Sequence, residues 1–186
     1  MIHVFGLVLL GYFAGAIPFG VILANLRGVD IREHGSGNIG ATNVTRVLGA
    51  RLGAVVLVLD AAKGALPVWF AIQQTGAPGT VCLVGWAAIL GHCFSPFLGF
   101  SGGKGVATAT GVFLMLSPRD VAIAVGVFLV VLAWKRVPAL GSLAAVAAFC
   151  LITLARGHTE FAVLAVATLL LLVYTHRTNL AKLTRP

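Results

Sequence analysis

The sequence predicts an all-α membrane protein: a polytopic helical bundle of about seven transmembrane helices, formed as a single domain over residues 1–186. Two observations predict this class. Of the 186 residues, 59% are hydrophobic and 10% are charged, whereas a soluble domain has roughly 25% charged and about 45–50% apolar residues. The hydrophobic residues also gather in long segments, and a membrane span needs roughly 20 such residues, with about 17 as the lower limit. We therefore interpret the apolar excess as a set of spans.

Seven apolar segments follow one another along the chain. They cover residues 2–24, 53–74, 80–97, 106–117, 119–135, 138–156 and 159–175. The first lacks a basic n-region and a convincing cleavage site, so we interpret it as a retained span rather than a signal peptide. The fourth has only twelve residues and follows Gly105 directly, so its N-terminal N–H groups would point at whatever the preceding loop binds. We expect that helix to be short, tilted or shielded by its neighbours.

The positions of Lys and Arg predict an N-terminus outside and a C-terminus in the cytoplasm, because cytoplasmic loops of membrane proteins carry the excess of cations. In this orientation ten cations lie in inner loops and the C-terminal tail, and two lie in outer loops. The inner set is Arg27, Arg32, Arg46, Arg51, Lys104, Lys135, Arg136, Arg177, Lys182 and Arg185; the outer set is Arg119 and Arg156. The net charge of +8 is then explained by topology and anionic lipid headgroups, and nothing in its pattern indicates nucleic acid.

The polar stretch between the first two apolar segments has the composition of an anion-binding loop. Glycines alternate there with hydroxyl and amide residues, and the stretch ends at Arg46. Glycine lets backbone N–H groups approach a ligand closely, and a guanidinium supplies the counter-charge for phosphate. The candidate residues are Ser36, Gly37, Asn38, Gly40, Thr42, Asn43 and Arg46. The alternative is a turn-rich connector, which needs fewer such residues.

A second glycine-rich loop, residues 101–105, lies on the same predicted side and precedes the fourth segment. Its candidate phosphate-binding residues are Gly102, Gly103, Lys104 and Gly105. The alternative is a tight turn whose lysine reaches the headgroups. The loop is not a Walker A motif, because Leu98 occupies the first glycine position and Gly105 follows the lysine. ATP hydrolysis is therefore not expected.

Polar residues inside or next to the apolar segments form a third group of candidates. Asp60 and Lys63 lie three apart in the second segment and share a helix face; they form a structural ion pair, or else Lys63 reaches the anion site. His92, near the inner end of the third segment, is either a buried hydrogen-bonding residue or part of the site. His176 and Asn179 follow the last segment three residues apart and can join the site.

The acidic residues predict that no metal ion takes part, and we expect no other cofactor. Asp30, Glu33, Asp60, Asp120 and Glu160 form no cluster with the spacing of Mg²⁺ or Zn²⁺ ligands. The DxxD-type metal motif of phosphatidyl-alcohol transferases is missing, and so is the H-x4-D pair of acyltransferases with soluble donors. Phosphate would then be bound by lysine, arginine and backbone N–H groups.

These motifs together resemble the bacterial integral-membrane glycerol-3-phosphate acyltransferases that take acyl-phosphate as donor. The resemblance covers essentially the whole chain and differs at Thr178, where relatives usually carry glutamate. It rests on residues 35–46, on Asp60-x-x-Lys63-Gly64, on Gly91-His92 with residues 102–105, and on His176-Arg177-x-Asn179. It implies one acyltransferase domain in the bacterial inner membrane, an active site on the cytoplasmic face, contact with membrane lipids and no obligate protein partner.

The resemblance also implies the reaction: transfer of a fatty acyl group from acyl-phosphate to the 1-hydroxyl of sn-glycerol 3-phosphate, giving lysophosphatidic acid and phosphate. It implies catalytic roles for Ser36, Arg46, Lys104, His176 and Asn179, with the remaining candidates, Lys63 and His92 among them, binding substrate. The general base stays open between His92, His176 and a substrate phosphate. A small carrier or flippase for an anionic lipid is the alternative function, disfavoured because the polar motifs lie on one predicted side.

Overall fold

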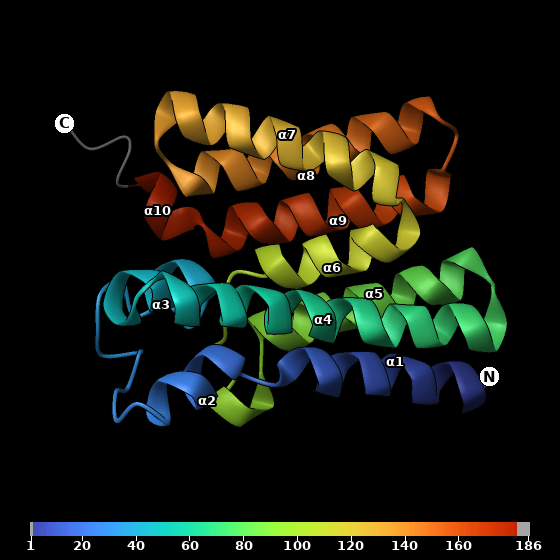
Figure 1. Cartoon of the computed structure of the whole chain (residues 1–186). Helices are drawn as coiled ribbons and strands as arrows, with labels where there is room; N and C mark the ends of the chain where they lie inside the picture. Colours follow the sequence, from blue (N-terminus) through green and yellow to red (C-terminus); the bar gives the residue numbers. More distant parts are fainter. Residues whose placement is uncertain (1, 182–186) are drawn as a thin grey trace. The chain divides into compact units, whose positions relative to one another are not determined.

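The computed structural model describes residues 2–181, and every regular element in that range is helical (Figure 1). The chain divides into two compact units, residues 1–112 and 113–186. The first unit holds α1 (Ile2–Ala16), α2 (Phe19–Asn25), α3 (Ala41–Leu48), α4 (Ala50–Thr75), α5 (Pro78–Cys93), the short 3-10 helix η1 (Pro96–Leu98) and the start of α6 (Val106–Leu116). The second holds α7 (Pro118–Lys135), α8 (Pro138–Ala155), α9 (Thr159–Thr175) and α10 (Arg177–Ala181).

The predicted apolar segments correspond closely to helices, but two of them are interrupted: in the third, α5 ends at Cys93 and η1 begins at Pro96, and the first is broken near the start of the chain. The first segment is not a continuous helix, because α1 ends at Ala16 and α2 begins at Phe19. Pro18 lies in the break, and proline has no N–H group with which to continue the helical hydrogen bonds. The break leaves backbone carbonyls without helical partners in the middle of a hydrophobic segment.

Within residues 2–181, four helical stretches are long and apolar enough to cross a membrane: His3–Asn25, Ala50–Thr75, Pro78–Leu98 and Pro138–Ala155. Helices α6 and α9 are shorter apolar helices. The protein is therefore a multi-pass membrane protein, while the count of seven spans stays a prediction. Two of the cations used to predict the topology, Lys182 and Arg185, lie outside the described residues.

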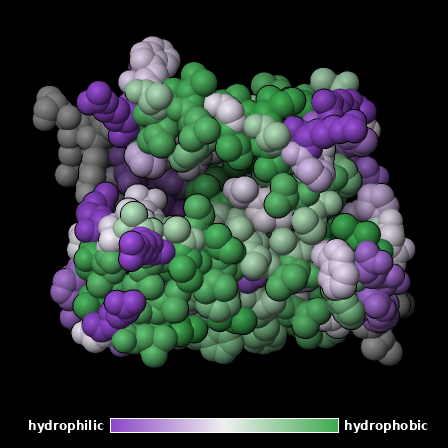
Figure 2. Space-filling model, viewed as in Figure 1, coloured by the Kyte–Doolittle hydropathy of each residue, from purple (hydrophilic) through white to green (hydrophobic). Residues whose placement is uncertain are grey.

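Large hydrophobic side chains are exposed along both units, and Figure 2 shows them covering most of the visible face. Examples are Phe5, Leu66, Trp69, Val130, Trp134, Leu151 and Leu170. Exposed apolar surface of this extent marks contact with lipid or another apolar partner. Burial in the first unit is correspondingly concentrated where helices meet.

Glycines allow the helices of the first unit to approach closely. A Cβ on Gly15 of α1 would overlap the backbone of Ala88 in α5, and a Cβ on Gly91 of α5 would overlap the backbone of Tyr12 in α1. Gly111 of α6 meets α4 at Ala61 in the same way. Small residues at such contacts are typical of membrane helices, whose association depends on close packing. These contacts join α1 closely to α5 and α6 closely to α4.

In the second unit a buried carboxylate ties helix ends together. Asp120, in the first turn of α7, is 0% exposed and accepts a hydrogen bond from Ser117 Oγ at 2.7 Å. Arg156, just after α8, places Nη1 2.5 Å from Asp120 Oδ1. Phe113 and Phe149 stack within the same unit, with ring centroids 4.3 Å apart. The Asp120–Arg156 ion pair links the start of α7 to the end of α8.

Candidate functional site

The first glycine loop is organised around the side-chain amide of Asn43, in the first turn of α3. Asn43 is 2% exposed, and its Oδ1 accepts a hydrogen bond from the Ser36 N–H at 2.8 Å. Its Nδ2 donates to the carbonyls of His34 and Ile31 at 2.9 and 3.3 Å. A buried amide with this many backbone partners fixes the path of the loop. Asn43 therefore holds the loop in shape from inside.

Other residues of the first loop divide into those that bend the chain and those that face outward. Gly35 and Gly37 have φ values of +64° and +70°, in the left-handed region that favours glycine. Asn38 Oδ1 accepts from the Gly40 N–H at 2.9 Å, immediately before α3 begins. The side chains of Ser36, Thr42 and Arg46 are exposed. The loop thus presents a hydroxyl-bearing and cationic surface on a backbone held by amides.

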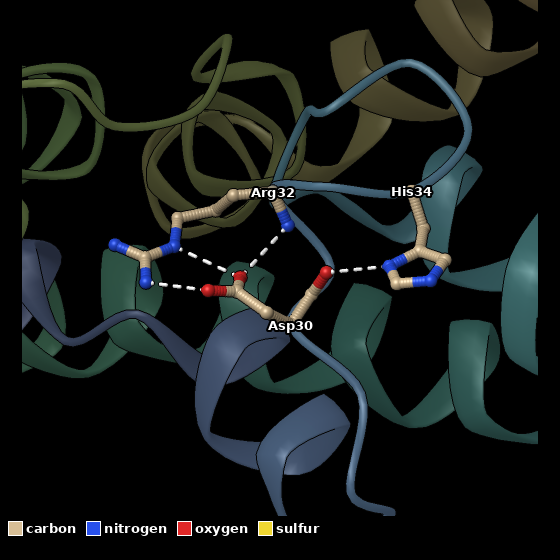
Figure 3. A network of polar contacts seen from close by, with 3 residues as sticks. All are labelled: Asp30, Arg32 and His34. Atoms are coloured by element: carbon tan, nitrogen blue, oxygen red, sulfur yellow. Dashed lines mark hydrogen bonds and ion pairs between the residues drawn. The ribbon is translucent and has the colours of Figure 1, made fainter.

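A polar contact that the sequence did not indicate lies just before this loop (Figure 3). The Arg32 guanidinium donates to both carboxylate oxygens of Asp30, at 2.9 and 2.6 Å, and the Arg32 N–H donates to the same group at 3.0 Å. These hydrogen bonds lower the pKa of Asp30 from 3.8 to about 2. His34 Nδ1 lies 2.9 Å from the Asp30 carbonyl oxygen. Arg32 therefore carries a charge that is already neutralised, unlike a phosphate-binding cation.

The second glycine loop is attached to the end of α5. The Gly102 N–H donates to the Cys93 carbonyl and the Gly103 N–H donates to the His92 carbonyl, both at 3.0 Å. The His92 imidazole lies against Gly103, because a Cβ added to Gly103 would overlap Nε2 of that ring. Any residue larger than glycine would displace the ring or the loop. Lys104 follows as a half-buried side chain, and Gly105, with φ +87°, leads directly into α6 as predicted.

Behind this loop lies a buried group of titratable side chains. Lys63 Nζ is 2.7 Å from Asp60 Oδ1 and donates to the Ile17 carbonyl at 2.7 Å, in the break between α1 and α2. The same Asp60 oxygen is 3.9 Å from His92 Nδ1. All three side chains are buried. This geometry favours the ion-pair interpretation of Lys63 over direct contact with a phosphate.

One hydrophobic cluster joins the first glycine loop to the segment that precedes the second. Ile39 of the first loop and Val44 of α3 are buried in it, together with Val56 of α4. Leu98, at the end of η1 and three residues before the second loop, packs against the same cluster. The first unit thus packs the chain just before the second loop against the same cluster that holds the first loop. In residues 2–181 no group of three or more His, Cys, Asp or Glu side chains is placed to hold a metal ion.

The last two candidates lie in the second unit, at the junction of α9 and α10. His176 is buried after the end of α9, and its Nδ1 lies 2.8 Å from the Leu172 carbonyl oxygen. The Asn179 N–H donates to the His176 carbonyl at 2.8 Å, so the two residues are one helical turn apart. That their side chains face the same site stays a prediction.

Comparison with known proteins identifies the family. The glycerol-3-phosphate acyltransferase family model matches residues 5–186. The chain belongs to the glycerol-3-phosphate acyltransferase family. It is 54% identical over 182 residues to a glycerol-3-phosphate acyltransferase of Myxococcus xanthus, covering 96% of this chain and 95% of that protein. The corresponding protein of Aquifex aeolicus is 41% identical over 179 residues, covering 95% of this chain and 93% of that one.

Two solved structures share the glycerol-3-phosphate acyltransferase fold along nearly the whole chain. Both are crystal structures of PlsY (YgiH), described as an integral membrane glycerol 3-phosphate acyltransferase, in a glycerol 3-phosphate form and a lysophosphatidic acid form. The first has a TM-score of 0.94 at 39% identity and covers 97% of this chain and 92% of that chain. The second has a TM-score of 0.92 at 39% identity, with coverage of 97% and 91%.

These comparisons confirm the predicted family, the acyltransferase class and the integral membrane location. They do not test the roles of individual residues, which stay predictions. The sequence indicated both glycine loops, but not which of their residues hold the loop backbone and which face outward. Asn43 was expected to bind substrate, and its hydrogen bonds instead run to the loop backbone. The sequence contains two asparagines in this loop, Asn38 and Asn43, and does not indicate which of them is buried.

Proposed function

We propose that this protein transfers a fatty acyl group from acyl-phosphate to the 1-hydroxyl of sn-glycerol 3-phosphate. The glycerol oxygen forms a new bond to the acyl carbon, the bond from that carbon to the phosphate oxygen breaks, and inorganic phosphate leaves. The hydroxyl proton passes to a base. The products are lysophosphatidic acid and inorganic phosphate, the first step of phospholipid synthesis. The single observation that carries the proposal is the family match over residues 5–186.

The chemistry of the two loops supports this reaction. Both substrates carry a phosphate, and each loop contributes one cation, Arg46 and Lys104, beside glycine and hydroxyl residues. An acyl-phosphate is a mixed anhydride with a good leaving group, so catalysis can consist of positioning and stabilisation of developing negative charge. In this proposal Ser36, Arg46 and Lys104 bind the phosphates, and His176 and Asn179 position glycerol 3-phosphate. No metal ion or other cofactor is needed.

The same proposal includes the finer topology. The chain forms one domain of seven spans in the bacterial inner membrane, with its N-terminus outside and its C-terminus in the cytoplasm. Both glycine loops then face the cytoplasm, where the soluble substrate is found. The charge distribution supports this orientation, because the loops on that side carry most of the Lys and Arg residues. We infer no obligate protein partner.

The decisive experiment is turnover by the purified protein. With acyl-phosphate and glycerol 3-phosphate it should release phosphate and form lysophosphatidic acid in equal amounts. Addition of EDTA should leave the rate unchanged, because the acidic residues are spaced too widely to hold a divalent cation. Movement of labelled lipid across vesicles without turnover would instead support a carrier.

The topology is tested by cysteine labelling in a background without the native cysteines. Glu33→Cys, just before the first glycine loop, and Ser101→Cys, at the start of the second, are at exposed positions and should react with a membrane-impermeant thiol reagent only from the cytoplasmic side. Ala77→Cys, exposed between α4 and α5, should react only from the opposite side. Labelling of the two loop positions from opposite sides would exclude a site shared by both loops.

A further inference from the structure

We propose that Asp60, Lys63 and His92 act as a positioning unit for the second glycine loop, and through it for Lys104. This inference rests on the proposed function and assigns roles to three residues that need not touch a substrate. It replaces the earlier expectation that Lys63 and His92 bind phosphate directly.

His92 holds the second glycine loop through contacts with Gly103. His92 contacts Gly103 twice: its carbonyl accepts the Gly103 N–H at 3.0 Å, and its imidazole packs where a Cβ would be. Gly103 directly precedes Lys104, so a change in the orientation of the His92 ring shifts the backbone on which Lys104 is mounted. A displacement of about 1 Å in a catalytic group can reduce a rate by roughly a hundredfold.

Asp60 supports His92 from behind. Asp60 Oδ1 lies 3.9 Å from His92 Nδ1, beyond hydrogen-bond distance, while Nε2 is the ring atom nearest the Cβ position of Gly103. The Asp60 carboxylate is in turn fixed by Lys63 at 2.7 Å. The nearby carboxylate gives the ring an electrostatic preference for the orientation in which Nδ1 faces Asp60.

Lys63 is anchored on the backbone. Its ammonium donates to the Ile17 carbonyl at 2.7 Å, in the break between α1 and α2. Ile17 lies between α1 and α2, and its carbonyl accepts the Phe19 N–H at 3.2 Å as well as the Lys63 ammonium. The contacts therefore run from the broken first span through Lys63, Asp60 and His92 to Gly103. A buried ion pair contributes little to stability by itself, so a positioning role explains its presence in an apolar segment.

The test is a double-mutant cycle with Lys104 in the purified protein. Asp60→Asn/Lys63→Met removes both charges together, which avoids leaving one buried charge without a partner. His92→Gln removes the ring. The matched control is Asp120→Asn/Arg156→Met, which removes an ion pair with a buried carboxylate in the second unit. Each is measured in the wild-type and Lys104→Ala backgrounds, with kcat and KM for both substrates.

If the unit acts through Lys104, Asp60→Asn/Lys63→Met and His92→Gln, the two site variants, should each lower kcat about 10-fold in the wild-type background. KM should change less than about 3-fold. In the Lys104→Ala background the further loss should be under about 2-fold, because residues that act as a unit are not additive. Hydrogen exchange at the Gly102 and Gly103 amides should accelerate in the site variants and stay unchanged in the control.

Equal losses in both backgrounds, or full activity in the site variants, would overturn the inference. Should the charge-pair variant fail to fold, His92→Gln decides by the same cycle and exchange measurement. Wild-type protein that does not turn over contradicts the proposed function itself. Wild-type protein that turns over normally, with additive losses in the variants, contradicts only the positioning role.

Discussion

The two glycine loops of the first unit have similar compositions but are held in shape by different means. In the first, residues 35–46, a side chain of the loop's own helix, Asn43, binds three backbone groups within twelve residues of itself. In the second, residues 101–105, the backbone is held by His92 and Cys93 at the end of α5. Behind His92 the support comes from Asp60 and Lys63 on α4.

The difference shows that glycine content alone does not determine which contacts hold a loop in its conformation. A loop that is organised from within keeps its shape as long as its own segment is intact. A loop that is organised from other helices depends on the packing of those helices. The first arrangement is vulnerable to a single substitution nearby, and the second to substitutions more than forty residues away, such as those at Asp60.

The largest expected effects come from the cation of each loop. Arg46→Ala and Lys104→Ala should each lower kcat/KM by roughly 10- to 150-fold, since a charge-assisted hydrogen bond to phosphate contributes about 1.5–3 kcal/mol. Lys104→Arg should restore little activity, because a planar guanidinium does not replace a compact ammonium between glycines. Steady-state kinetics measure these effects.

Arg51→Ala is the control for both cations, since Arg51 is exposed on the same predicted side and belongs to neither loop. It should leave kcat/KM unchanged. If Arg46→Ala and Lys104→Ala behave like Arg51→Ala while the protein stays folded, the loops only anchor to headgroups. A large loss of kcat/KM for only one of the two variants would mean that only that loop's cation binds phosphate.

A smaller effect is expected from the internal support of the first loop. Asn43→Ala should destabilise the protein by about 1–3 kcal/mol, because it leaves buried backbone groups without partners. Activity should fall by about tenfold as the loop loosens. Thermal unfolding in detergent, together with kinetics, measures both.

Asn38→Ala is the matched comparison, since the Asn38 side chain accepts one hydrogen bond, from Gly40, and is only partly buried. Its effect on stability should be about 0.5–1.5 kcal/mol. Equal stability losses for the two asparagines would mean that Asn43 does not organise the loop.

The smallest effect is expected at Asp30, whose pair with Arg32 lies on the surface before the first loop. Asp30→Asn should change kcat/KM by less than about twofold, because exposed ion pairs contribute little. The pKa of Asp30 is lowered from 3.8 to about 2, so its contribution to stability is present above pH 3.8 and is lost as the pH falls toward about 2.

The melting temperatures of wild type and Asp30→Asn should therefore differ by a constant amount at neutral pH and converge over that acidic interval. Thermal unfolding at stepped pH measures the difference. A gap that closes at higher pH would show that the Asp30–Arg32 pair does not form as described.

The sequence determined the membrane class and the family of this protein. Long apolar segments can be satisfied only by helices in a bilayer, because lipid offers no hydrogen bonds to the backbone. The order of the glycine loops, the Asp60 and Lys63 pair and the C-terminal His176 and Asn179 was enough to identify the acyltransferase family. These are features of residue type and spacing, which the sequence carries directly.

Only the tertiary structure decided which polar side chains are buried and which parts of the protein they contact. Spacing predicted that Asp60 and Lys63 could pair, but the Ile17 carbonyl that Lys63 binds lies 46 residues earlier, in a helix break. Likewise, nothing in the local sequence indicates that Gly103 must be glycine because a histidine ring occupies its Cβ position. Such contacts join segments that are distant along the chain, and they form only when packing brings those segments together.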